Sequence, residues 1–91
     1  NIIGPHAQVH IKWLEMKAAK GDAKAINQLA DYTGVSFEFW TRRNAMNAMK
    51  RINTLNELAL WNMLDASWNP NSRLSSSAVE TLQYLVKTSF S

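Results

Sequence analysis

The sequence predicts an all-α fold: a compact bundle of about five short helices that forms a single domain over residues 1–91. Apolar side chains recur at helical spacing in five stretches, and residues that cap or break helices separate those stretches. No segment alternates between polar and apolar residues for long enough to indicate a strand. The chain contains no cysteine, and 91 residues can bury a sufficient core without disulfides.

The first two helices are predicted over residues 6–19 and 23–32. Gly21 separates them, and the carboxylate of Asp22 can cap the second helix by accepting hydrogen bonds from its first backbone N–H groups. The first helix has more apolar surface than a single stripe, so we expect it to contact two neighbours. Its two stripes are Val9, Trp13 and Met16 on one side, and Ile11, Leu14 and Ala18 on the other.

The third helix is predicted over residues 37–51 and the fourth over residues 55–66. Gly34 can end the preceding helix in a left-handed conformation, and Ser36 can cap the third helix. Thr54 and Glu57 match a capping box at the start of the fourth helix. Apolar residues point almost all round this fourth helix, so it either lies at the centre of the core, which we expect, or shares a face with a partner.

A loop over residues 67–73 is predicted before the fifth helix, which we expect over residues 78–88. Asn69 and Pro70 give the turn signal of this loop. Ser77 and Glu80 match a second capping box, which predicts the start of the helix.

The corner between the second and third helices carries a recognisable pattern. Residues 29–36 read Leu-Ala-Asp-Tyr-Thr-Gly-Val-Ser: a small Ala30 where two helices cross, a turn at Gly34, an apolar plug at Val35 and a cap at Ser36. Over residues 29–44 the chain resembles the helix-turn-helix unit of DNA-binding proteins of the LacI and lambda-repressor kind. The resemblance implies that the third helix enters the major groove of DNA.

The family pattern and the helical periodicity disagree about which side of the third helix is buried. The family reads bases at the positions of Phe37, Glu38 and Arg42, and usually has buried aliphatic residues where this chain has Trp40 and Arg43. Periodicity alone buries Phe37 and exposes Arg43, because it groups Phe37 and Trp40 with Ala45, Ala48 and Ile52. The third helix therefore either docks rotated from the family geometry, or forms a helix–glycine–helix corner with no role in DNA binding.

Our first functional hypothesis is binding of double-stranded DNA through the helix at residues 37–51. Arginine can donate two hydrogen bonds to guanine or phosphate, and asparagine can pair with adenine. This hypothesis requires Arg42, Arg43, Asn47 and Lys50 to share one exposed basic face. The candidate nucleic-acid contacts are Ser36, Glu38, Arg42, Arg43, Asn44, Asn47, Lys50 and Arg51.

The second hypothesis is a non-enzymatic module for protein interaction or assembly, such as a virion, effector or complex subunit. It would bind a protein partner, or a second copy of itself, through the apolar helix at residues 55–66 and the loop that carries Trp68. Tryptophan and methionine on a surface are typical of protein interfaces. The candidate partner-binding residues are Trp61, Met63 and Trp68.

Charge and composition limit the remaining classes of function. Residues 1–51 hold eight of the ten basic side chains and four of the seven acidic ones, which suits a polyanion partner but also an ordinary lysine-rich surface. The carboxylates are scattered, and neither a nucleophile elbow nor a glycine-rich phosphate loop is present. We therefore expect no enzyme activity, cofactor, metal site or small-molecule substrate.

Sequence features also give an expectation about location. No apolar run approaches the roughly 20 residues that cross a membrane, and the lack of cysteine suits a reducing compartment. We expect a cytoplasmic or nucleoid-associated protein that is not embedded in a membrane, with secretion of a processed form left open. The chain begins with Asn1 rather than Met, which suggests a processed product or an excised fragment.

Overall fold

All regular structure in the described part of the chain is helical, which confirms the all-α prediction. The computed structural model describes the backbone of residues 5–90 and the side chains of residues 7–88. The helices are α1 (Pro5–Ala19), α2 (Ala23–Tyr32), α3 (Phe39–Arg51), α4 (Glu57–Ala66) and α5 (Ser72–Phe90).

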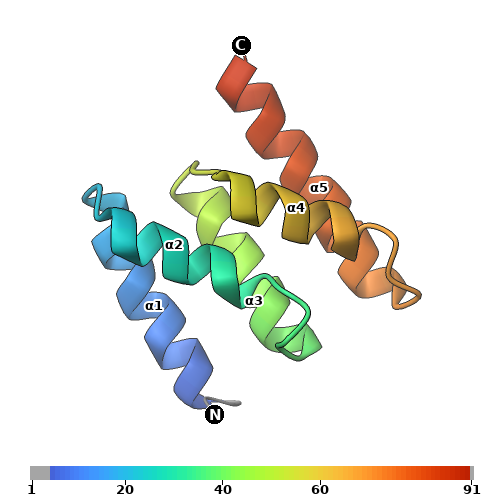
Figure 1. Ribbon diagram of the computed structural model, residues 1–91, viewed down its shortest axis with the longest axis horizontal. Helices are drawn as coiled ribbons and strands as arrows, with labels where there is room; N and C mark the ends of the chain where they lie inside the picture. Colours follow the sequence, from blue (N-terminus) through green and yellow to red (C-terminus); the bar gives the residue numbers. More distant parts are fainter. Residues whose placement is uncertain (1–4, 91) are drawn as a thin grey trace.

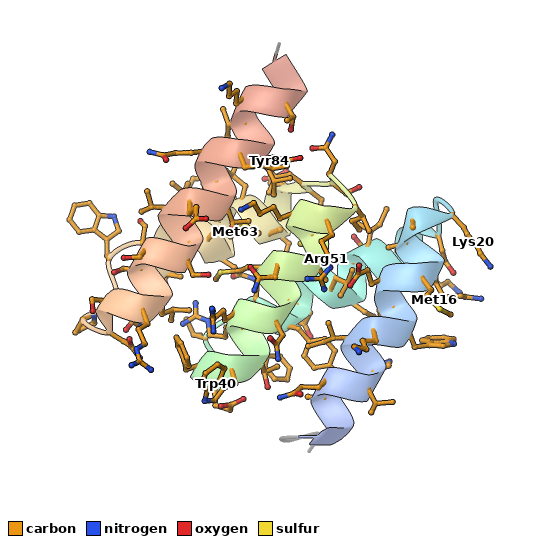
Figure 2. All side chains as sticks on the ribbon, turned by 180° about the vertical axis from the view of Figure 1, so that it is seen from behind. Met16, Lys20, Trp40, Arg51, Met63 and Tyr84 are labelled. Atoms are coloured by element: carbon orange, nitrogen blue, oxygen red, sulfur yellow. The ribbon has the colours of Figure 1, made fainter. Side chains whose placement is uncertain are left out.

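The helices form two layers. In one layer α1, α3 and α5 lie side by side with α3 in the middle, and in the other α2 and α4 cross over them (Figures 1 and 2). Helix α3 packs against α1, α2 and α5, whereas α4 packs against α2 and α5. Helix α2 also packs against three others, namely α1, α3 and α4, so α2 and α3 form the centre of the bundle, and our expectation that the fourth helix lies there is wrong.

Small and flexible side chains let these helices approach closely. Helix α3 contributes Ala45, Met46, Ala48 and Met49 to the core, all fully buried. Alanine permits a short distance between helix axes, and methionine adapts its shape to irregular gaps. This explains how a helix with a low proportion of large apolar residues can occupy the centre.

Two helix starts differ from the predicted capping boxes. Helix α4 begins at Glu57 rather than residue 55, because the Asn56 side chain accepts a 2.9 Å hydrogen bond from the backbone N–H of Ala59. Helix α5 begins at Ser72 rather than residue 78, and the Asn71 side chain accepts a 3.0 Å hydrogen bond from the backbone N–H of Arg73. Residue 77, predicted to be a cap, therefore lies well inside α5.

The third helix begins at Phe39 rather than residue 37, and its cap is Glu38 instead of Ser36. The Glu38 carboxylate accepts hydrogen bonds from the backbone N–H groups of Trp40 and Thr41, at 3.2 and 2.9 Å. It also accepts one from the Thr41 hydroxyl at 2.7 Å, which is the main reason that its pKa is lowered. Ser36 stands in the preceding loop with its side chain exposed.

Candidate functional site

The corner between α2 and α3 is wider than a helix-turn-helix turn. Six residues, 33–38, separate the two helices, whereas the turn of a helix-turn-helix unit typically has three or four. Val35, expected to plug the corner, is 72% exposed. Phe37 fills the corner instead. Its side chain is half-buried, and the centre of its ring lies 4.7 Å from the centre of the Tyr32 ring.

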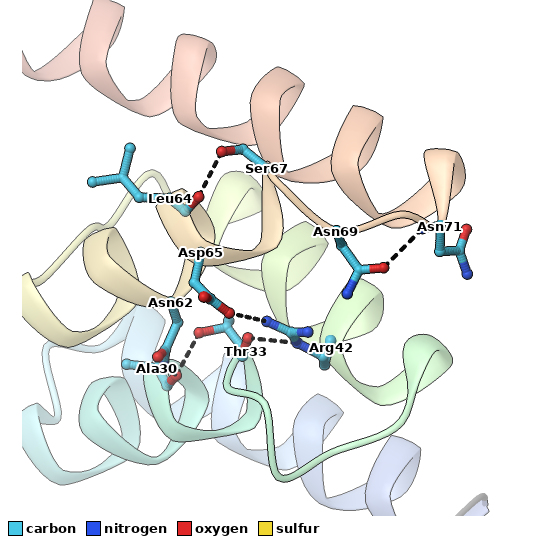
Figure 3. Close-up of polar contacts among 9 residues, drawn as sticks. All are labelled: Ala30, Thr33, Arg42, Asn62, Leu64, Asp65, Ser67, Asn69 and Asn71. Carbon is cyan, nitrogen blue, oxygen red and sulfur yellow. Dashed lines mark hydrogen bonds and ion pairs between the residues drawn. The ribbon is translucent and has the colours of Figure 1, made fainter.

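The corner requires glycine at position 34 because a side chain there would crowd its neighbours, and not because the backbone is left-handed. Among the described residues, positive φ occurs at Gly21 and Asn53, not at Gly34. A Cβ atom at Gly34 would lie 3.1 Å from the carbonyl oxygen of Asp31 and 3.2 Å from the side-chain nitrogen of Asn62. That Asn62 nitrogen donates to the carbonyl oxygen of Ala30, so α4 is anchored directly against the end of α2 (Figure 3).

Arg42 also contacts the end of α2, and it is not part of an exposed basic face. Its side chain is 5% exposed, and Nε donates a 3.0 Å hydrogen bond to the carbonyl oxygen of Thr33. Nη2 lies 3.9 Å from the Asp65 carboxylate and has no hydrogen-bond partner (Figure 3). Burial lowers the pKa of Arg42, and the nearby Asp65 carboxylate partly opposes that shift. Arg42 therefore cannot reach DNA in this conformation, contrary to the sequence-based assignment.

Arg51 is also committed to a contact within the chain. It donates from Nε and Nη2 to the two carboxylate oxygens of Glu15, at 2.9 and 2.6 Å, and so joins α3 to α1. These hydrogen bonds are the largest cause of the lowered pKa of Glu15 and the raised pKa of Arg51. The guanidinium is partly accessible, but two of its five N–H donors, on Nε and Nη2, already bind a carboxylate.

Three of the remaining nucleic-acid candidates line a groove between α3 and α5, while Asn44 is half-buried outside it. The groove has a volume of about 480 Å³. Lys50 is paired there with Glu80, at 3.4 Å between charged atoms, and lies over the ring of Tyr84. The side chains that line this α3/α5 groove are Arg43, Asn47, Lys50, Arg73, Ser76, Ser77, Glu80 and Thr81.

The contribution of α5 to this groove could not be found from the sequence. We expected residues 67–73 to form a loop and Ser77 to cap a helix, so Arg73, Ser76 and Ser77 were not placed on a helix beside α3. The available signal was Asn71, an asparagine that can cap a helix as well as form part of a turn. Neither Phe37 nor Arg43 faces fully outward, since both are half-buried.

Helix α4 has a second candidate site on the side opposite the core. Leu58, Trp61 and Leu64 are spaced three residues apart, which places them along one side of the helix. They are 45%, 61% and 40% exposed. Trp68 follows Trp61 by two helical turns and is 88% exposed. Residue 67 still has helical backbone angles, and we therefore group Trp68, just beyond the end of α4, with these three residues. We refer to these four residues as the α4 outer face.

Met63 is not part of the α4 outer face. Its side chain is fully buried, as are those of Ala59 and Ala66, which helical spacing places on the same side of α4. It therefore contributes to the core rather than to partner binding, contrary to the sequence-based assignment. The exposed charged residues of α4 are Glu57 and Asp65, next to Leu58 and Leu64 in the sequence, and they give the rim of the α4 outer face a negative charge.

Comparisons with protein-family models, with curated proteins and with solved structures found no match to this chain. Across the described residues, no three His, Asp or Glu side chains gather in a way that could hold a metal ion. Every helix described here is too short or too polar to span a lipid bilayer.

Proposed function

We propose that the protein is a non-enzymatic interaction module that binds a protein partner through the α4 outer face. The observation that supports this is the exposure of Trp61 and Trp68, at 61% and 88%, together with that of Leu58 and Leu64 on the outer side of α4. Burying such side chains against a partner releases ordered water, and tryptophan is among the residues that contribute most to binding energy at interfaces. Several large apolar side chains exposed together on one helix are typical of an interaction site.

The charges around the α4 outer face define the chemistry of the partner. Glu57 and Asp65 are both exposed beside these apolar residues. Carboxylates at the rim of an interface favour a partner with positive charges at matching positions and repel an acidic one. The partner that fits is an amphipathic helix whose apolar stripe is flanked by lysine or arginine.

The proposal can be tested by calorimetric titration with a designed probe. The probe is a synthetic amphipathic helix with a leucine stripe flanked by lysines, and its control carries glutamates in place of the lysines. We expect the basic probe to bind, and Trp61→Ala to weaken binding by roughly tenfold to thirtyfold. Trp40→Ala, which changes a tryptophan that is 48% exposed on α3, serves as the matched control and should bind as the wild type does. Equal binding of both probes, or an undiminished affinity of Trp61→Ala, would contradict the proposal.

A second candidate function is binding of nucleic acid in the α3/α5 groove. The observation that favours it is the presence of Arg43, Lys50 and Arg73 with a single carboxylate, Glu80, along one groove. Asn47 and two serine hydroxyls add hydrogen-bond donors that could contact phosphates. The burial of Arg42 and the pairing of Arg51 with Glu15 make this basic surface smaller than the DNA hypothesis first required.

Fluorescence anisotropy with duplex DNA across a salt series tests the second candidate. If the groove binds phosphates, the logarithm of affinity falls linearly with the logarithm of salt concentration, and replacing both Arg43 and Lys50 with Ala makes that slope shallower by about 2. Absence of binding at low salt would exclude this function without affecting the first proposal.

A further inference from the structure

Helix α1 also carries an apolar stripe that no other part of the described chain covers. Val9, Trp13 and Met16 are 69%, 50% and 59% exposed, whereas the opposite side of α1 is buried through Ile11 and Leu14. Figure 2 shows Met16 and Lys20 projecting from α1 away from the bundle. The sequence predicted two neighbours for this helix, and α1 does pack against α2 and α3, but both contacts leave Val9, Trp13 and Met16 exposed. We refer to Val9, Trp13 and Met16 as the α1 outer face.

The charges around the α1 outer face are positive. Lys12 and Lys17 lie on either side of the stripe and Lys20 lies at its end, while the Lys17 ammonium group sits 5.4 Å from the centre of the Trp13 ring. Glu15, the acidic residue of this helix, is bound to Arg51 and so does not offset them. The exposed side of α1 is therefore both apolar and basic.

The two outer faces complement each other in charge and length. The α1 outer face runs over residues 9–16, about 10.5 Å along its helix, and the helical part of the α4 outer face runs over residues 58–64, about 9 Å. One face has a lysine rim and the other has a rim of Glu57 and Asp65. Pairing α1 with α1 would bring lysines together, and pairing α4 with α4 would bring carboxylates together, so each face fits the other better than it fits itself.

We propose that the partner is a second copy of this chain, whose α1 outer face docks against the α4 outer face. This inference rests on the proposed function and names its partner. Because the two faces belong to different helices, the contact is heterologous: each copy uses α1 toward one neighbour and α4 toward another. Repetition of such a contact produces an open filament or a closed ring rather than a two-fold dimer.

A mixing experiment measured by light scattering after size-exclusion chromatography tests this arrangement. Wild-type protein should show an average mass that rises with concentration above that of a dimer. Trp13→Ala lacks a complete α1 face and Trp61→Ala lacks a complete α4 face, so each variant alone should remain at the monomer mass of 10.3 kDa. Mixed in equal amounts they should form a species of twice that mass, because each supplies the face that the other lacks. Trp40→Ala should assemble as the wild type does.

Three outcomes would overturn the inference. A wild-type protein that stays monomeric from micromolar to millimolar concentration excludes self-assembly. Association of only one of the two variants on its own indicates an isologous contact, and a mixture with no species of dimer mass excludes pairing of α1 with α4. If self-assembly fails but the basic probe still binds the α4 outer face, the partner is another molecule and the proposed function stands. If both fail, the proposed function is wrong as well.

Discussion

Replacing Arg42 with alanine should destabilise the protein strongly, even though charged residues on helices are usually replaceable. Arg42 donates a 3.0 Å hydrogen bond from a buried guanidinium to the carbonyl oxygen of Thr33, at the end of α2. A hydrogen bond to a charged group contributes about 1.5–3 kcal/mol, and its removal leaves a buried carbonyl unpaired. The ion pair with Asp65 adds little, because that carboxylate is 64% exposed and 3.9 Å away.

Two terms partly offset this loss. The alanine variant no longer buries the charge of Arg42, and it removes an Nη2 atom that has no hydrogen-bond partner. We therefore expect a net loss of about 2 kcal/mol in the free energy of unfolding. For a domain of this length, that corresponds to a fall of roughly 8–16 °C in the midpoint of thermal unfolding.

Circular dichroism on thermal unfolding measures this effect, with Arg43→Ala as the matched control. Arg43 is the next residue, is half-buried, and lies 5.5 Å from the ring centre of Trp40, a contact worth about 0.5–1 kcal/mol. Equal midpoints for the two variants would refute the structural role of Arg42. Such a result would return Arg42 to the list of possible nucleic-acid contacts.

Three other substitutions test neighbouring parts of the account. Met63→Ala should lower the free energy of unfolding by about 2–5 kcal/mol in urea titrations, because it leaves a cavity in the core; a loss below about 1 kcal/mol would contradict its burial. Gly34→Ala should lower it by roughly 1–3 kcal/mol in the same assay, because its Cβ would crowd a backbone carbonyl at 3.1 Å; unchanged stability would show that the corner relaxes freely. Glu15 has a pKa below its ordinary value of 4.5, so its pairing with Arg51 stabilises the fold above that pH and is lost as the pH falls through the lowered pKa. Thermal unfolding should therefore show Glu15→Gln less stable than the wild type near pH 7, with the difference shrinking in acid; a difference that persists unchanged in acid would contradict this.

Helical periodicity predicted the number and approximate position of the helices well, because each buries one side of a regular pattern. The starts of α3, α4 and α5 were less predictable, since several polar residues near each start could act as the cap. For α5, Asn71 and Ser77 are both good capping residues, and the burial of Leu74 in the core, just after Asn71, accompanies the earlier start.

The candidate site was harder to predict than the fold. Arg42 and Arg43 are adjacent and chemically identical, yet one is buried and the other lines a groove. The difference comes from Thr33 and Asp65, which meet Arg42 only after α2 and α4 have packed. A single-helix pattern contains no information about such partners.

The apolar outer faces show the opposite case, in which the sequence signal was present but had two interpretations. The two apolar stripes of α1 predicted two neighbours, which are α2 and α3, yet Val9, Trp13 and Met16 remain exposed. The apolar residues all round α4 indicated either a central position or a shared face. Spacing alone cannot tell whether the neighbour belongs to the same chain. The layer arrangement supplies that information, since it leaves both stripes on the outside of the bundle.

The most direct test of the central claim is fluorine NMR of protein labelled with fluorotryptophan. The four tryptophans report on four places: Trp13 on α1, Trp40 on α3, Trp61 on α4, and Trp68 after α4. On addition of the basic amphipathic probe to dilute protein, we predict that the resonances of Trp61 and Trp68 shift while those of Trp13 and Trp40 do not. A shift at Trp40 alone, or no shift at Trp61 and Trp68 at saturating probe, would contradict the assignment of function to the α4 outer face.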